Sequence, residues 1–277
     1  MRCRWMFVVP GLLVAVAACG LAGAPPPSAS PAAAPRPAQT AAPSPARSLA
    51  RVSPPVSAPP SAAASPSAPS MPSASAQVLQ PGASGPAVTR LQQRLAGLGY
   101  YPGPADGQFG GDTLEAVWAF EEVQGLPAQN VVTAAMQRAL ASPRAPAVLV
   151  PGGGSTRIEV NLAVEVLVLY RDNQVALISH VSSGGGYYYC SPGGGCGYAV
   201  TPTGNYATTA YMPGWVTVPL GEMYNPVFFI GTAYAIHGDT YVPLQPVSHG
   251  CVRIPMDIAS FFHTLVPTPG TPVYIRG

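Results

Sequence analysis

The chain has 277 residues, of which 48% are hydrophobic and only 9% charged, and its formal net charge is +2 at neutral pH. This length accommodates about two domains. Residues 77–277 hold eight arginines and eleven acidic residues, a net charge of −3, and therefore lack the basic footprint of a nucleic-acid-binding protein.

The first 19 residues have the organisation of a signal peptide. Two arginines lie among the first four residues, an apolar run covers residues 6–17, and small residues precede Cys19. The apolar run is too short for a membrane-spanning helix. The four residues ending at Cys19 resemble a bacterial lipobox, which implies a lipidated cysteine and a membrane anchor; ordinary cleavage after residue 24 is the alternative. We expect an exported protein at the outer face of the cytoplasmic membrane, in the cell wall or in the periplasm.

Residues 20–76 consist almost wholly of Pro, Ala and Ser and include no aromatic residue. A segment of this composition cannot bury enough apolar surface to fold, so we predict a disordered linker. As polyproline II such a linker extends by about 3.1 Å per residue, enough to carry the following domain well away from a membrane.

Residues 77–141 are predicted to form a small three-helix domain. Apolar residues recur at helical spacing in two stretches, at positions 88, 91, 95 and 98 and at positions 114, 117, 118 and 120. The segment 99–107 between them is dense in turn residues, and a third short helix follows Asn130. The order of glycine and apolar positions from Gly85 to Leu126 resembles the three-helix peptidoglycan-binding module, although Asn130 stands where that family more often has glycine. The resemblance implies peptidoglycan as a partner.

Proline and glycine return in residues 142–156, which we predict to be a second linker. The alternation of apolar residues from Arg157 to Tyr170 predicts a strand with one buried face. Further strands are expected at residues 174–181, 203–211 and 227–237, and a helix near residues 255–265. Residues 157–277 should thus form a mostly-β domain, a β-sandwich with one or two short helices, and the whole chain an α+β multidomain protein.

The segment from Ser248 to Arg253 places one cysteine, Cys251, two residues after His249, and His237 and Gly238 lie eleven residues upstream of that segment. Cysteine attacks carbonyl carbon as a thiolate, and at its ordinary pKa little thiolate exists at neutral pH, so a neighbouring imidazole must assist. Either histidine is a candidate. These residues predict a thiol nucleophile.

The segment Ser248–Ile254, together with His237-Gly238, resembles the signature of the L,D-transpeptidase catalytic domain of the YkuD type. The similarity extends to residues 201–204 and 270–275. It implies that Cys251 is the nucleophile and His237 the base, oriented through the Gly238 carbonyl. It further implies a supporting role for His249, a backbone oxyanion hole around His249, Gly250 and Cys251, and a loop- or substrate-stabilising role for Arg253. Asp239 departs from the threonine or serine usual in that family.

The activity implied by this resemblance is a two-step acyl transfer without metal or cofactor. Cys251 would cleave the diaminopimelate–D-Ala bond of a peptidoglycan tetrapeptide, and an amine would then resolve the thioester to form a 3→3 cross-link. Carbapenems are expected to acylate the same sulfur. Water as the acceptor would make the protein an L,D-carboxypeptidase, and a non-catalytic wall-binding scaffold is a third possibility.

Two further features concern the β domain. Cys190 and Cys196 flank a glycine-rich loop and are expected to form a disulfide in an oxidising exterior, although two separate thiols or a metal clip are alternatives.

Three consecutive tyrosines precede Cys190, and at least one ring must point outward from a pleated strand. We expect Tyr188 and Tyr189 to contact substrate, with strand packing as the alternative. No metal site is expected, because His237, His249 and Cys251 lack a second cysteine pair.

Overall fold

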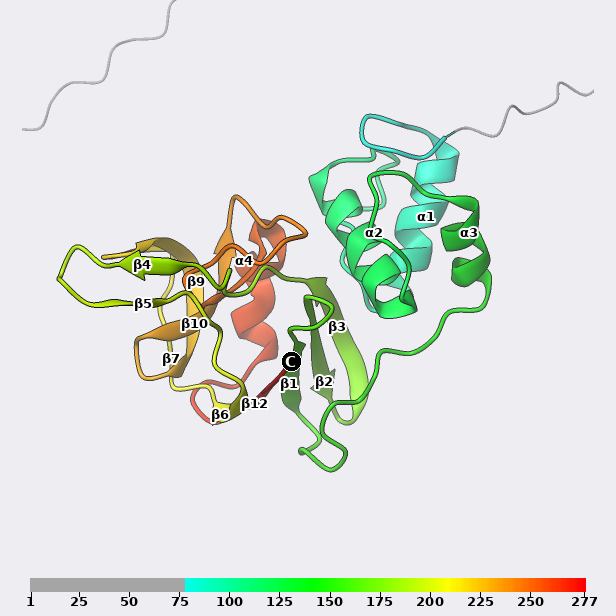
Figure 1. Ribbon diagram of the computed structural model, residues 1–277. Coiled ribbons are helices and arrows are strands. Elements are labelled where there is room, and N and C mark those ends of the chain that lie inside the picture. The colour runs from blue at the N-terminus through cyan, green and yellow to red at the C-terminus, as the bar shows by residue number, and fades with distance from the viewer. Residues whose placement is uncertain (1–77) are drawn as a thin grey trace, which may run out of the picture. The chain divides into compact units, whose positions relative to one another are not determined.

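The computed structural model describes residues 78–277 (Figure 1). The expectations for the signal peptide, for lipidation of Cys19 and for the linker 20–76 lie outside these residues. The helices are α1 (Pro86–Ala96), α2 (Gly111–Gln124), α3 (Ala134–Ala141) and α4 (Met256–Leu265). The strands are β1 (Arg157–Asn161), β2 (Val166–Arg171), β3 (Gln174–His180), β4 (Tyr188–Cys190), β5 (Cys196–Tyr198), β6 (Gly204–Ala207), β7 (Ala210–Tyr211), β8 (Trp215–Val218), β9 (Gly221–Ile230), β10 (Tyr234–Asp239), β11 (Val252–Pro255) and β12 (Pro272–Arg276).

Residues 78–141, the helical module, contain α1, α2 and α3, which confirms the predicted three helices. Helix α2 ends at Gly125, whose φ of 69° is the left-handed conformation that glycine adopts most readily. Helix α3 begins after Thr133, whose hydroxyl accepts a hydrogen bond from the N–H of Met136 at 3.1 Å. Leu95 and Phe120, which belong to the predicted apolar stripes, are completely buried, and so is Met136 on α3.

Residues 157–277, the β domain, are built on two five-stranded sheets that enclose one core. The first sheet has the order β3-β2-β1-β12-β6; the second runs β11-β10-β9-β7, and β8 also pairs with β9. Buried residues of both sheets and of α4 form a single apolar cluster, among them Ile158, Leu167, Ile236, Val252 and Phe262. The predicted mostly-β sandwich with a short helix is therefore confirmed.

The run from Arg157 to Tyr170 is two antiparallel strands, not the single strand that its alternation predicted. The chain turns at residues 162–165, where Glu165 has a φ of 49°. The apolar alternation continues through the turn, but the residues it places on one face lie on different sides of the sheet. Ile158 and Leu167 lie in the core between the two sheets, whereas Val166 and Val168 lie in a second apolar cluster on the outer side of this sheet. Because β2 is buried on both faces, it is apolar at successive positions, and the change of face at the turn leaves no mark in the sequence pattern.

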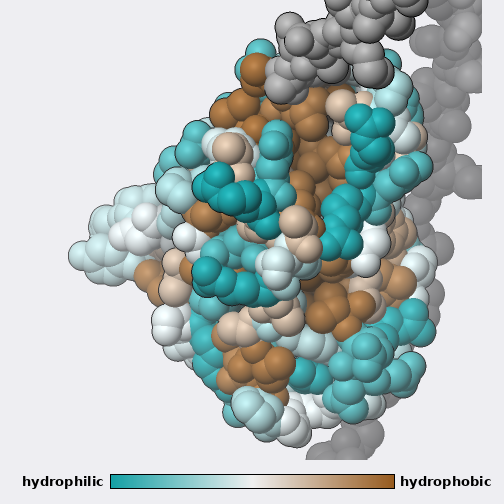
Figure 2. Space-filling model, turned by 90° about the vertical axis from the view of Figure 1, so that its right-hand side faces the viewer, coloured by the Kyte–Doolittle hydropathy of each residue, from teal (hydrophilic) through white to brown (hydrophobic). Residues whose placement is uncertain are grey.

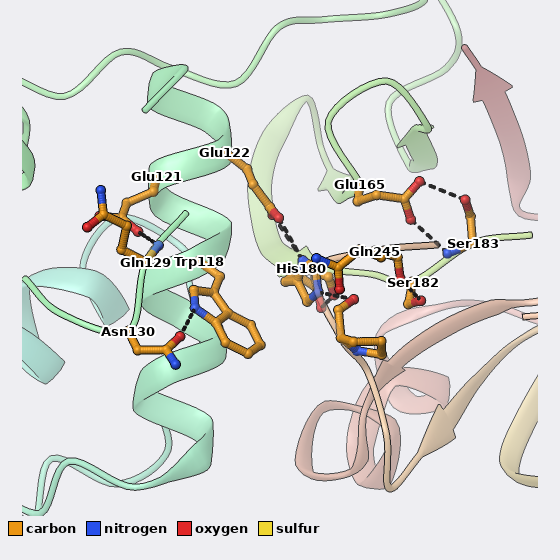
Figure 3. A network of polar contacts seen from close by, with 12 residues as sticks. Trp118, Glu121, Glu122, Gln129, Asn130, Glu165, His180, Ser182, Ser183 and Gln245 are labelled. Atoms are coloured by element: carbon orange, nitrogen blue, oxygen red, sulfur yellow. Dashed lines mark hydrogen bonds and ion pairs between the residues drawn. The ribbon is translucent and has the colours of Figure 1, made fainter. Parts of the chain in front are cut away.

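The second face of β2 and β3 packs on the helical module. Val168 and Ile178 share an apolar cluster with Tyr100 and Phe120, and the N–H of Ile178 donates to the Gly99 carbonyl at 2.8 Å. Figure 3 shows a polar contact in the same region, in which Nδ1 of His180 lies 2.9 Å from a carboxylate oxygen of Glu122.

One face of the molecule carries a band of hydrophobic residues bordered by hydrophilic ones, as Figure 2 shows. Within residues 78–277, no helix combines the length and the hydrophobicity needed to cross a membrane.

Candidate active site

The candidate site lies where β10 and β11 run side by side. These strands are parallel, with Ile236 opposite Val252 and His237 opposite Arg253. Parallel pairing thus brings together two stretches that are separated in sequence by the loop 240–251, which we name the signature loop. Because side chains alternate along a strand, His237 and Arg253 lie on one face of the sheet, while buried Ile236 and Val252 lie on the other.

His237 is 4% exposed, and its Nδ1 lies 2.9 Å from the carbonyl oxygen of Gly238. A carbonyl oxygen only accepts hydrogen bonds, so Nδ1 carries the hydrogen and Nε2 of the neutral ring is left as a base. Burial lowers the pKa of His237, although the hydrogen bond to Gly238 acts in the opposite direction. The ring is therefore neutral and ready to accept a proton at neutral pH.

Cys251 is the free cysteine among the described residues, and it directly precedes β11. Its Sγ lies 3.9 Å from the carbonyl oxygen of Ala233. Burial raises the pKa of the Cys251 thiol above its ordinary value, with a smaller lowering by Arg253. The sulfur therefore rests as a neutral thiol, and its attack requires a base to remove the proton.

The backbone around Cys251 is held by two hydroxyl groups. Ser248 Oγ accepts from the N–H of Gly250 at 2.9 Å and donates to the carbonyl of Cys251 at 2.5 Å. Thr201 Oγ1 donates to the Gly250 carbonyl at 2.8 Å and accepts from the N–H of Gly184 at 2.8 Å. This role of Thr201 was not predictable from the sequence, because the residues it joins are far apart along the chain.

Gly250 adopts a conformation closed to most other residues. Its φ is 133°, and a Cβ at this position would lie 2.6 Å from the ring of Tyr234 and 2.7 Å from the carbonyl oxygen of Val200. Gly238 is also confined, since a Cβ there would lie 2.6 Å from the Cβ of Ala259 on α4. Both glycines next to the candidate histidines thus serve close packing of the backbone.

Arg253 faces Asp239 within the site. Nε of Arg253 lies 3.1 Å from a carboxylate oxygen of Asp239, and Nη1 donates to the Tyr241 carbonyl at 3.3 Å. The Nε contact has the distance of an ion pair without the alignment of a hydrogen bond, as Nε has no hydrogen-bond partner among the described residues. Asp239, the departure noted in the sequence, therefore supplies a charge that neutralises Arg253.

One cavity of about 730 Å³ brings these residues together, a size typical of small-molecule sites. Its lining includes His237, Asp239, Ser248, His249, Cys251 and Arg253. Strands β8 and β9 and their connection supply an apolar wall with one acidic residue, which was not predicted from the sequence. This wall consists of Val216, Val218, Pro219, Leu220, Glu222 and Met223. The β4–β5 hairpin supplies another wall, of which Tyr189, Ser191, Cys196 and Gly197 are part.

The two tyrosines expected at the substrate are placed differently. Tyr189 lines the cavity, and its ring centroid lies 4.8 Å from that of His249. Tyr188 is outside the cavity lining, 63% exposed, and packs on Tyr198. Successive side chains of a strand point to opposite sides, so only one of two consecutive tyrosines can face the cavity.

The other cysteines and histidines of the β domain lie as follows. Cys190 and Cys196 are joined by a disulfide between β4 and β5. His263 stacks on Tyr211 at 4.3 Å, and His180 contacts Glu122, so neither lies with the cavity histidines. Within the part of the chain that the structure describes, no three His, Cys, Asp or Glu side chains are grouped as metal ligands.

Comparisons with known proteins identify the family of each domain. Residues 155–275 match the L,D-transpeptidase catalytic domain family (YkuD), and residues 84–140 match a peptidoglycan binding domain family. A crystal structure of an L,D-transpeptidase (residues 123–326) from Xylanimonas cellulosilytica is 34% identical with a TM-score of 0.68; the match covers 76% of this chain and all of that one.

A curated relative, the spore cortex-lytic enzyme of Bacillus cereus, is 44% identical over 66 residues. That match covers 24% of this chain and 26% of the relative, so the chain spans about a quarter of the length of that protein. The structural match, in contrast, extends over the whole compared chain. The protein therefore belongs to the L,D-transpeptidase (YkuD) family and carries an N-terminal peptidoglycan-binding domain.

Proposed function

We propose that the protein is a cysteine-dependent L,D-transpeptidase that forms 3→3 cross-links in peptidoglycan. The observation that supports this most directly is the meeting, in one cavity, of a free thiol on Cys251 and a buried imidazole on His237. The ring of His237 is oriented by the carbonyl of Gly238, which leaves Nε2 to accept a proton. A nucleophile, a base and a group that orients the base are the parts that acyl transfer requires.

In the first half-reaction, Sγ of Cys251 attacks the carbonyl carbon between the L-centre of diaminopimelate and D-Ala. The thiol proton passes to Nε2 of His237 and from there to the nitrogen of the departing D-Ala. A thioester remains on Cys251. Because the thiol rests neutral and the imidazole has a lowered pKa, proton transfer accompanies the attack instead of preceding it.

In the second half-reaction, the side-chain amine of a neighbouring stem peptide attacks the thioester. His237 takes a proton from this amine and returns it to the sulfur as the new amide forms. The step needs neither metal nor nucleotide, since the energy of the cleaved amide is retained in the thioester.

Negative charge on the carbonyl oxygen needs backbone donors near Cys251. The N–H of Gly250 already donates to Ser248 Oγ, so of the three groups expected from the sequence we assign the oxyanion hole to the N–H groups of His249 and Cys251. Arg253, neutralised by Asp239 at the cavity edge, is suited to hold a substrate carboxylate by exchanging partners. We retain Tyr189 as a substrate contact, because it lines the cavity.

The rest of the chain fits the same role. A signal peptide over residues 1–19, a lipidated Cys19 and the linker 20–76 would hold the helical module (77–141), the linker 142–156 and the catalytic domain (157–277) outside the cytoplasmic membrane. The helical module would bind peptidoglycan and keep the enzyme on its substrate. Carbapenems, which are reactive acyl compounds, would acylate Cys251.

Mass spectrometry with a purified disaccharide tetrapeptide tests this function. Loss of D-Ala and a cross-linked dimer, both abolished by Cys251→Ala, are expected. Tripeptide without dimer would identify an L,D-carboxypeptidase, and the absence of both would leave a wall-binding scaffold.

A further inference from the structure

The segment Tyr187–Tyr198, which we name the disulfide hairpin, forms one wall of the cavity through Tyr189, Ser191 and Cys196. Strands β4 and β5 pair antiparallel, with Tyr188 opposite Tyr198 and Cys190 opposite Cys196. Three-residue strands in a two-stranded sheet have little stability of their own in water. The disulfide between the opposed cysteines compensates for this, because it limits the freedom of the opened hairpin.

Two rings of this hairpin enclose the imidazole of His249. The ring centroid of Tyr189 lies 4.8 Å from that of His249, and that of Tyr187 lies 5.4 Å away; both are edge-to-face contacts. The Tyr187 hydroxyl also donates to the carbonyl of Val247, in the signature loop, at 3.3 Å. The His249 ring makes no hydrogen bond to any residue between 78 and 277, so these two rings hold it.

The backbone beside the hairpin is tied to the same loop. The N–H of Gly185 donates to the Ser248 carbonyl at 3.0 Å, and the N–H of Ser248 donates to the Ser183 carbonyl at 2.9 Å. Gly186 and Ala199 close the base of the hairpin through a 2.8 Å hydrogen bond from N–H to carbonyl. The hairpin therefore meets the signature loop through both backbone and side chains.

We propose that the disulfide hairpin positions His249 and, through it, the backbone next to Cys251, with Tyr189 as the main positioning residue. This inference rests on the proposed function, since its value to the enzyme is the alignment of the N–H groups of His249 and Cys251 toward the reacting carbonyl. Tyr189 acts through its ring, because the contact with His249 is made by ring faces and edges. The disulfide keeps Tyr189 in place.

The adjacent Tyr188 provides a matched control. It lies on the same strand, but its ring packs on Tyr198 at 5.3 Å and points away from the cavity. Tyr188→Ala and Tyr189→Ala thus remove the same atoms from neighbouring positions, and only the second removes a contact with His249. Tyr189→Phe keeps the ring and removes the hydroxyl.

The test follows the NMR signal of the His249 ring, which the nearby aromatic rings shift from its free value, together with kcat and KM for D-Ala release. In Tyr189→Ala we expect the His249 signal to move toward its free value and kcat to fall about tenfold to 100-fold, as misplaced catalytic groups do. Loss of the substrate contact itself would be measured separately, as a rise in KM. Tyr188→Ala should retain both the signal and kcat, and Tyr189→Phe, which keeps the ring, should retain the signal. A Cys190→Ser/Cys196→Ser double variant should behave like Tyr189→Ala while retaining the unfolding temperature of the β domain within a few degrees.

An unchanged His249 signal in Tyr189→Ala, or an equal loss of kcat in Tyr188→Ala, would overturn the inference. Failure of the proposed function would look different: the unsubstituted protein would release no D-Ala, while the NMR comparison would still decide whether Tyr189 holds His249.

Discussion

Nδ1 of His237 lies 2.9 Å from the carbonyl oxygen of Gly238, the next residue in β10. This contact fixes both the tautomer and the ring orientation, because only an N–H can pair with a carbonyl oxygen. Replacement of His237 by Gln should therefore lower kcat for D-Ala release by about 10²–10⁴-fold, the usual contribution of a general base. His263→Gln, which removes a ring stacked on Tyr211 outside the cavity, is the control. Equal losses in the two variants would contradict the assignment of His237.

The pH dependence of the reaction follows from two shifted groups. Burial lowers the pKa of His237 from its ordinary 6.5, so the ring stays neutral, and active as a base, to a lower pH than a free histidine would. We expect the acidic limb of kcat/KM to have its midpoint below 6.5. Burial raises the pKa of the Cys251 thiol, so its alkylation by iodoacetamide should still be increasing above pH 9. Rapid alkylation at pH 6 would instead reveal a resting thiolate.

Gly250→Ala should impair the signature loop. The φ of 133° and the 2.6 Å approach of a Cβ to Tyr234 force the loop to move, and such backbone strain costs roughly 1–3 kcal/mol. We expect kcat to fall by at least about tenfold, as misplacement of reacting groups predicts. Gly111→Ala is the matched control, because a Cβ there meets nothing within 4 Å. Activity close to that of the unsubstituted protein in Gly250→Ala would show that the loop tolerates the change.

Stability should decrease as the pH rises from 6.5 to 8. Burial raises the pKa values of Asp112, Glu115 and Glu121 to about 7 each, well above those of carboxyl groups in an unfolded chain. The folded protein therefore holds protons that the unfolded chain has already released, and it loses the associated stability as pH rises through about 7.

Thermal unfolding between pH 6.5 and 8 measures this effect. The histidines with lowered pKa values, His237 and His249, contribute in the opposite sense near pH 6.5 and below, but the three carboxyl groups outnumber them. His180, whose pKa is raised, adds to the loss of stability with rising pH. Glu115→Gln should flatten the curve. A melting temperature that rises with pH across this range would contradict the prediction.

The contact between Glu122 and His180 predicts a large cost for removing one partner. The carboxylate of Glu122 accepts from Nδ1 of His180 (Figure 3). Nε2 of His180 lies 3.2 Å from the Pro243 carbonyl. Burial acts to lower the pKa of His180, but the hydrogen bond and charge of Glu122 outweigh it and raise that pKa. Glu122→Ala should destabilise the protein by roughly 3–5 kcal/mol, as expected for breaking a buried pair.

Urea unfolding measures this cost, with Glu222→Gln, an exposed carboxylate, as the control. Replacement of both Glu122 and His180 by Leu should cost less than Glu122→Ala, because no buried charge is then left without its partner. Additive losses would contradict the pairing.

Much of the site could be predicted from the sequence because its reactive residues occupy short, distinctive stretches. The helices of the module and the strand beginning at Gln174 were predictable for a similar reason, since their apolar periodicity reflects a buried face. The turn inside residues 157–170 was hidden, because β2 is buried on both faces and Glu165 marks the turn without glycine or proline.

The cavity walls were less predictable. Strands β4 and β5 have three residues each and sit among glycines, so neither length nor periodicity reveals them. Which of Tyr188 and Tyr189 faces the cavity depends on where the hairpin meets the signature loop, a contact between segments some 60 residues apart. The valines of β8 line the cavity and also pack on a small apolar cluster, so their alternation does not separate a binding wall from core packing.

The central claim concerns the sulfur of Cys251. Intact-protein mass spectrometry during incubation with disaccharide tetrapeptide should detect a covalent adduct equal to the substrate less D-Ala, absent in Cys251→Ala and followed by a 3→3 dimer in the unsubstituted protein. Products that form equally well in Cys251→Ala, without an adduct, would contradict it.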